Sequence, residues 1–275
     1  MSYKSITVCL DNSAASSRLL DFAITLTAQH DAHLTGLHMT YAPIIFSDPY
    51  AVWEPMMMEW EESAQTKQEH VRKTFIAASD KASVNSDFSA YRSTDLHAVI
   101  AHARASDLTI VAQRNLGDSD GDMRNNFPIS FVLKLGRPVL FFPCTGEVST
   151  TFKTIVIAWD GGREATRAMA DAMPFLKLAK QVKVLSISER IDEDHDLPDV
   201  DIAAYLSKHN VKVEIERNEN VQIAPAEWLL QRAENCGADL LVMGAYGHNR
   251  LTELILGGVT RTVMGQMTLP VLMSH

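Results

Sequence analysis

The sequence has few cysteines, no excess of positive charge and no long apolar run, and each lack excludes a class of protein. The three cysteines, Cys9, Cys144 and Cys236, are widely spaced and form no CxxC pair, so we expect neither a disulfide framework nor a zinc site. The formal net charge of −9 at pH 7 argues against nucleic acid and anionic membranes as partners, since both favour a basic surface.

No apolar run approaches the roughly 20 residues that a membrane span needs, so we expect no membrane partner. The first residues, Met-Ser-Tyr-Lys-Ser-Ile, lack the apolar core of a signal peptide. Together with the unpaired cysteines, these features predict a cytoplasmic protein.

The chain contains an internal repeat. Residues 4–11, KSITVCLD, resemble residues 153–160, KTIVIAWD, at an offset of 149 (160 against 11). Residues 106–111, SDLTIV, resemble residues 238–243, ADLLVM, at an offset of 132 (238 against 106). The difference of 17 predicts an insertion in the first copy, which we assign to Tyr41–Met57. A repeat of this length predicts two tandem domains, residues 1–145 and 152–275.

The second copy alternates between apolar strand patterns and helical patterns. The predicted strands are 154–159, 181–187, 211–215, 239–243 and 270–273, and the predicted helices are 163–179, 202–208, 225–235 and 259–267. Such alternation predicts an α/β fold, with one doubly wound, Rossmann-like, parallel five-stranded sheet in each copy. If the first and fourth strands flank the point where the winding reverses, Asp160 and Gly244 open onto one crevice.

Spaced glycines follow the fourth strand of the second copy. Gly244 and Gly247 are separated by two residues, and nine residues then precede Gly257 and Gly258. Glycine lets the main chain approach an anion closely, and the N–H groups that begin a helix have partial positive charge. This pattern predicts a nucleotide phosphate site, although a GxxG pair alone also suits a tight turn.

With this glycine motif, the second copy resembles the universal stress protein family. The family's ATP-binding members have Gly-x2-Gly-x9-Gly-Ser/Thr here, which Gly244, Gly247 and Gly257 match. Gly258 replaces the Ser/Thr, and Thr260 is the nearest hydroxyl. The resemblance implies ATP, ADP or AMP as ligand, with Mg²⁺ left open. The predicted contacts are Asp160, Ile187, Gly244, Gly247, His248, Arg250, Gly257, Gly258, Val259 and Thr260.

Several of these residues also suit a purely structural role that involves no ligand. Asp160 also suits the N-cap of the following helix. His248 and Arg250 also suit a solvated loop. In the first copy Ala112, Asn115, Asn125 and Asn126 stand where the second copy has glycines, and only Asp11 is kept. A side chain at those positions blocks close backbone approach, so we expect the first copy not to bind triphosphate in this way.

The resemblance implies a cytoplasmic stress-response protein that senses an adenine nucleotide and signals to a protein partner of unknown identity. It also implies pairing of the two copies through their last strands, an intramolecular pseudo-dimer, and leaves further homodimer formation open. The sequence has no GxxxxGK[ST] loop and no lysine between 240 and 275, so any hydrolysis or autophosphorylation should be slow. A nucleotide-independent interaction protein that uses residues 41–57 is the remaining alternative.

Overall fold

The computed structural model describes residues 2–13, 15–40, 53–92, 97–113, 127–186, 198–217, 223–246 and 258–275. The chain divides into two compact units, residues 3–111 and residues 112–275. Within the described ranges, every helix is too short or too polar to cross a lipid bilayer.

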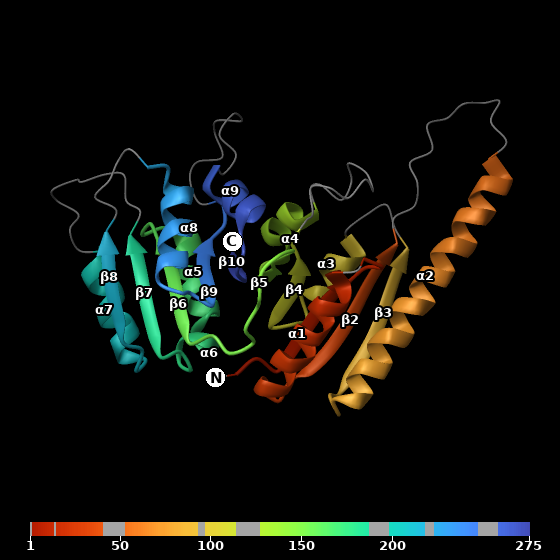
Figure 1. Cartoon of the computed structure of the whole chain (residues 1–275), viewed down its shortest axis with the longest axis horizontal. Helices are drawn as coiled ribbons and strands as arrows, with labels where there is room; N and C mark the ends of the chain where they lie inside the picture. Colours follow the sequence, from red (N-terminus) through yellow and green to blue (C-terminus); the bar gives the residue numbers. More distant parts are fainter. Residues whose placement is uncertain are drawn as a thin grey trace. The chain divides into compact units, whose positions relative to one another are not determined.

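The unit of residues 3–111 is a parallel sheet with helices packed against it (Figure 1). The strands lie in the order β3-β2-β1-β4, and β1 pairs in parallel with both β2 and β4. Its elements are β1 (Ser5–Leu10), α1 (Ala15–His30), β2 (His33–Thr40), α2 (Trp53–Lys81), β3 (Ser86–Arg92), α3 (His97–Ala103) and β4 (Leu108–Ala112).

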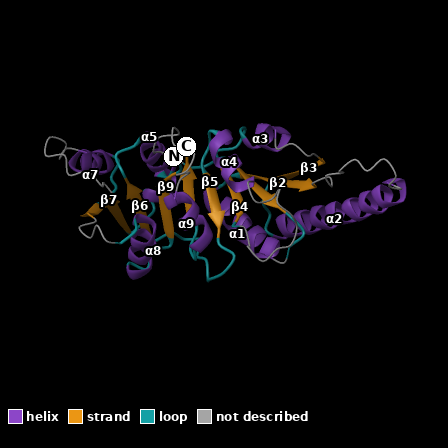
Figure 2. Ribbon diagram, turned by 90° about the horizontal axis from the view of Figure 1, so that it is seen from above, coloured by secondary structure: helices purple, strands orange, loops and turns teal. Residues whose placement is uncertain are grey.

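The unit of residues 112–275 has strands in the order β5-β10-β9-β6-β7-β8. Figure 2 shows α5 and α7 on one face of this sheet and α8 and α9 on the other. Its elements are α4 (Phe127–Leu135), β5 (Val139–Phe142), β6 (Thr154–Trp159), α5 (Arg163–Asp171), α6 (Met173–Leu176), β7 (Gln181–Ser186), α7 (Pro198–Lys208), β8 (Val213–Arg217), α8 (Pro225–Asn235), β9 (Leu240–Gly244), α9 (Gly258–Gln266) and β10 (Val271–Ser274).

The central strands form where the sequence is apolar on both faces, whereas β3 and β8 contain several polar residues. Ile155, Val156 and Ile157 of β6 are fully buried, as expected for a parallel strand that has helices on both sides. The α/β class, the tandem arrangement and the parallel pairing within each copy are therefore confirmed.

One antiparallel contact interrupts the parallel pattern. The last strand of the first copy, β5, pairs with β10, the last strand of the second copy, and Leu140 lies opposite Leu272. Both leucines are fully buried, and burial of such a side chain contributes about 1.5–3 kcal/mol. Consistent with this pairing, α4 and β5 of the first copy belong to the same compact unit as the second copy. The boundaries at 145 and 152 stay a prediction.

Two expectations about the elements need correction. The predicted helix 163–179 is two helices, because the chain leaves the helix at Ala172, where ψ is −5°, and Pro174 follows. Proline has no N–H to donate, and its ring clashes with the carbonyl four residues earlier. The extra residues of the first copy fall partly in α2, which has 29 residues against 11 in α7. Residues 41–52 lie outside the described part of the chain.

Candidate functional site

The first and fourth strands of the second copy are neighbours. β6 pairs in parallel with β9, with Ile155 opposite Leu240 and Ile157 opposite Val242. Parallel strands end at the same edge of a sheet, so Asp160 and Gly244 emerge side by side at the carboxyl edge of β6 and β9. This is the arrangement that the sequence predicted, and it lies where doubly wound sheets bind their ligands.

Gly244 is required by packing. A Cβ atom at this position would lie 2.5 Å from the backbone N of Ala165 and 2.6 Å from the carbonyl carbon of Glu164. The first turn of α5 therefore rests directly on the end of β9, and no other residue type fits there without a shift of the helix. This role is independent of the phosphate contact that the sequence motif predicts for Gly244.

Asp160 shapes the turn between β6 and α5. Its Oδ1 accepts a hydrogen bond from the Gly162 N–H at 2.8 Å, and Gly161 has a φ of 73°. The N-cap of α5 is Gly162, with no side-chain cap, so the capping role considered for Asp160 is wrong. Asp11 makes the same kind of turn, since its Oδ1 accepts the Ser13 N–H at 2.9 Å. The aspartate thus has a structural role in both copies.

A hydrogen bond joins the start of α9 to the turn that follows β9. Thr260 is 3% exposed, and its Oγ1 accepts a hydrogen bond from the Tyr246 N–H at 3.3 Å. Tyr246 has a φ of 59°, the left-handed conformation that non-glycine residues seldom adopt. Val259 is half-buried and Gly258 is exposed. This arrangement holds the first turn of α9 close to the site edge.

Gly258 differs from Gly244 because no packing among the described residues requires it. Apart from its own helix and its chain neighbours, no described atom lies within 4 Å of a Cβ built at Gly258. The first turn of α9 contains no acidic residue and includes the exposed Arg261. The positive end of the helix dipole is therefore not neutralised from within its own first turn, a situation that favours an anion.

The remaining predicted contacts lie outside the described residues: Ile187, Gly247, His248, Arg250 and Gly257. The same holds for the first-copy positions Asn115, Asn125 and Asn126. The structure thus brings Asp160 and Gly244 to one edge and ties Thr260 to the turn after Gly244. The ligand roles of all these residues stay predictions.

Two aromatic residues at the site edge were missed by the sequence analysis. Trp159 Nε1 and Tyr246 Oη are both buried without a hydrogen-bond partner among the described residues. Burial raises the pKa of the Tyr246 hydroxyl, against the opposing effect of the Arg261 charge. A buried donor left unpaired costs about 1–3 kcal/mol. The sequence indicated these residues only by placing an aromatic side chain with one polar group, an indole N–H or a phenol hydroxyl, at or near the ends of β6 and β9.

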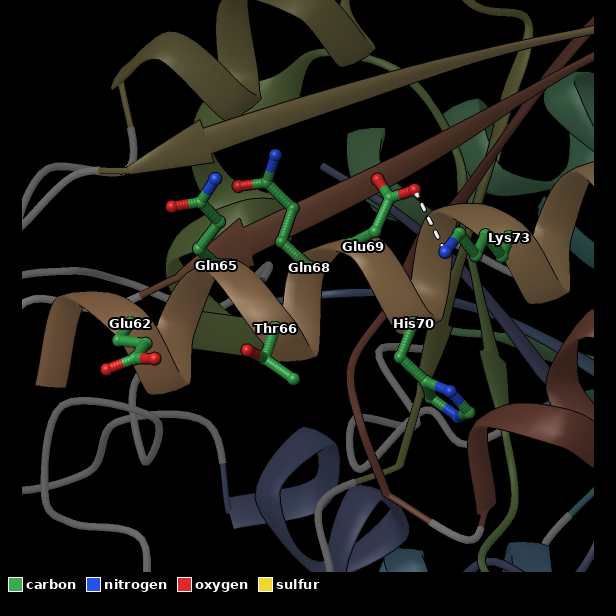
Figure 3. A pocket seen from close by; sticks show the side chains of 7 residues that line it. All are labelled: Glu62, Gln65, Thr66, Gln68, Glu69, His70 and Lys73. Atoms are coloured by element: carbon green, nitrogen blue, oxygen red, sulfur yellow. Dashed lines mark ion pairs between the residues drawn. The ribbon is translucent and has the colours of Figure 1, made fainter. Parts of the chain in front are cut away.

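A cavity on the surface of α2 has a different character (Figure 3). Its lining residues are all polar or charged and all belong to this helix: Glu62, Gln65, Thr66, Gln68, Glu69, His70 and Lys73. Glu69 pairs with Arg72 at 2.8 Å and with Lys73 at 3.7 Å, and the Arg72 hydrogen bond lowers the pKa of Glu69 to about 2. None of the predicted ligand contacts lines this cavity.

Comparison with known proteins agrees with both the repeat and the fold. A family model described as the universal stress protein family matches residues 2–124 and 151–275. A universal stress protein of Mycobacterium tuberculosis is 21% identical over 98% of this chain and 96% of its own length. One of Mycolicibacterium smegmatis is 23% identical over 97% and 95%.

Among solved structures, the crystal structure of a universal stress protein from Archaeoglobus fulgidus has the same fold. Its TM-score is 0.71 at 17% sequence identity, and the match covers 98% of this chain and 97% of that chain. Because the family model matches both copies and together these matches span most of the sequence, the chain belongs to the universal stress protein family, as a tandem of two such domains.

Proposed function

We propose that the second copy binds an adenine nucleotide, ATP, ADP or AMP, at the carboxyl edge of β6 and β9. The phosphates would approach the first turn of α9 at Gly258, Val259 and Thr260, and the nucleoside would lie toward Asp160. Gly247, His248, Arg250 and Gly257 would complete the phosphate side, and Ile187 the nucleoside side.

The observation that supports this proposal most directly is the N-terminus of α9, whose own first turn contains no acidic residue. Gly258 begins this helix and is exposed, and among the described residues it leaves open space where a side chain would stand. An aligned row of free N–H groups attracts a phosphate without the help of a lysine. The Thr260–Tyr246 hydrogen bond fixes this end of the helix beside the strand that ends at Gly244.

We further propose that the bound nucleotide acts as a switch and is not rapidly turned over. Residues 240–275 contain no lysine to stabilise charge on a transferred phosphoryl group. The described residues contain no group of three His, Cys, Asp or Glu side chains that could hold a metal ion. Repeating each titration with EDTA tests whether Mg²⁺ contributes through the phosphates.

The substitution Gly258→Asp separates binding from folding. A carboxylate at the first position of a helix interacts favourably with the helix dipole, so the protein without ligand should be as stable as the wild type. The same negative charge should repel a phosphate, and we expect the affinity for ATP to fall at least about 10-fold, which corresponds to roughly 1.4 kcal/mol. Calorimetric titration with ATP, ADP and AMP, together with thermal unfolding, measures both effects.

Gly265→Ala is the matched control, because Gly265 lies in the same helix with no atom within 4 Å of its added Cβ. It should bind ATP like the wild type. If Gly258→Asp binds ATP as tightly as this control does, the helix terminus is not the phosphate site and the proposal fails.

A further inference from the structure

Gln113, the residue directly after β4, contacts α9 through its side chain. Its Nε2 donates a hydrogen bond to the backbone carbonyl of Met264 at 2.9 Å, and its Oε1 accepts one from the Cys144 N–H at 2.8 Å. Gln113, Cys144 and α9 all belong to the compact unit of residues 112–275. The amide of Gln113 thus connects Cys144, two residues after β5, to the helix that precedes β10.

The carbonyl of Met264 is one that α9 cannot satisfy by itself. α9 ends at Gln266, and the last four carbonyls of any helix have no intrahelical donor. Gln113 therefore caps the C-terminal end of the helix whose N-terminal end begins at Gly258. Nine residues of α-helix span only about 13 Å, so a constraint at one end limits movement at the other.

The equivalent position in the second copy lacks this connection. The offset of 132 pairs Gln113 with Ala245. Both residues use their backbone N–H in the same way, Gln113 bonding to the carbonyl of Phe142 at 2.6 Å and Ala245 to that of Ser274 at 2.9 Å. Only Gln113 has a side chain long enough to bridge to a neighbouring element. The bridge is therefore a property of this position in the first copy and not of the repeated fold.

We propose that Gln113 is a positioning residue for the nucleotide site of the second copy. It holds α9 so that the N–H groups of its first turn face the phosphates. A residue of the first copy, which lacks the glycine motif, thus supports the nucleotide site of the second copy. This proposal rests on the proposed function. Because coupling is reciprocal, a phosphate bound at the start of α9 also tightens the contact between Gln113 and Met264.

The test compares ATP with adenosine, because only ATP engages the first turn of α9. Gln113→Ala removes both side-chain hydrogen bonds of Gln113. We expect its affinity for ATP to fall about 3- to 10-fold, the effect of losing the hydrogen bond to α9, while its affinity for adenosine stays within about 2-fold. Gln113→Glu keeps the acceptor for Cys144 N–H and the side-chain volume but loses the donor to Met264, so it should lose the same ATP affinity. Gln68→Ala, on the polar face of α2, is the control and should match the wild type.

Hydrogen exchange measured without nucleotide provides a second readout. The amides of residues 258–267 should exchange faster in Gln113→Ala than in the wild type, and at the wild-type rate in Gln68→Ala. Wild-type protein that binds neither ATP nor adenosine overturns the proposed function and this inference with it. Wild-type ATP affinity in either Gln113 variant, or unchanged exchange in α9, overturns this inference alone.

Discussion

At the scale of single residues, His38 is a buried titratable group that makes stability depend on pH. It lies in β2, 5% exposed, with Nδ1 2.9 Å from the carbonyl of Leu10 and Nε2 3.3 Å from the hydroxyl of Thr40. Since a carbonyl only accepts, Nδ1 bears a proton. Burial favours the neutral ring, in which Nε2 accepts from the Thr40 hydroxyl.

Burial lowers the pKa of His38 more than the Leu10 carbonyl and the Asp11 charge raise it. The unfolded chain has the ordinary pKa of about 6.5, so below that pH it binds a proton more readily than the folded protein does. The free energy of unfolding should therefore fall as pH decreases from 7.5 to 5, by at most about 1.4 kcal/mol per pH unit for this group. Urea unfolding across this range measures the effect.

His38→Asn is the matched variant, because its amide nitrogen replaces Nδ1 as donor to Leu10 and does not titrate. Its stability should decline less over the same range. Buried His30, whose pKa is also lowered by burial, remains in both proteins. It contributes to the fall in the free energy of unfolding that both proteins should show as the pH decreases. Parallel pH curves for the two proteins would contradict the assignment to His38.

Residue roles at the site were only partly predictable from sequence. The predicted strand topology placed Asp160 and Gly244 at one edge of the sheet, because ligand sites lie where the strand order of such a sheet reverses. Topology could not show that Asp160 bonds to Gly162 and is not the N-cap, since both roles suit an aspartate before a helix. The topology also could not show that Trp159 Nε1 has no hydrogen-bond partner among the described residues, because burial of one atom depends on the packing around it.

At the scale of elements, the spacing of apolar residues predicted which faces of helices and strands are buried better than it predicted where each element ends. β6 and α8 occupy the predicted ranges 154–159 and 225–235. The break between α5 and α6 was missed because Met169, Met173 and Leu176 form one buried stripe across it. A continuous apolar face predicts a continuous helix, and only Pro174 in the sequence marks the interruption.

The contact between α5 and β9 gives a prediction at this scale. In Gly244→Ala the new methyl group would lie within 3 Å of the α5 backbone, so the helix must move or the strand must bend. We expect the free energy of unfolding to fall by about 1–3 kcal/mol, the usual cost of overpacking. Gly258→Ala adds the same methyl group in open space and replaces glycine in a helix, so its stability should be equal or up to about 1 kcal/mol higher.

Chemical denaturation of the two alanine variants beside the wild type measures this difference. Equal stabilities for Gly244→Ala and Gly258→Ala would show that α5 is not seated tightly on the end of β9. A large loss in Gly258→Ala would show that the start of α9 is more crowded than the structure indicates.

At the scale of the whole molecule, the tandem organisation followed from the repeat, but the pairing of β5 with β10 did not. Leu140 and Leu272 are far apart in the sequence, and nothing in their local pattern specifies a partner or an antiparallel direction. That pairing came only from the resemblance to the family. It means that the last strands of the two copies cover each other's edges, so neither is left as an exposed edge strand.

The two copies should differ in ligand binding although they share a fold. The second copy has Gly244 and Gly258 at the positions where the first has Ala112 and Asn126. We therefore expect one adenine nucleotide per chain, seen as a single adduct by native mass spectrometry and as a stoichiometry of one by calorimetry. At a free ATP concentration 100 times the dissociation constant, one site stabilises the folded protein by about 2.7 kcal/mol, which thermal unfolding detects. In Gly258→Asp a 10-fold loss of affinity should reduce this stabilisation to about 1.4 kcal/mol at the same ATP concentration. Two adducts per chain would show that the first copy also binds nucleotide, and an undiminished stabilisation in Gly258→Asp would contradict a site at the start of α9.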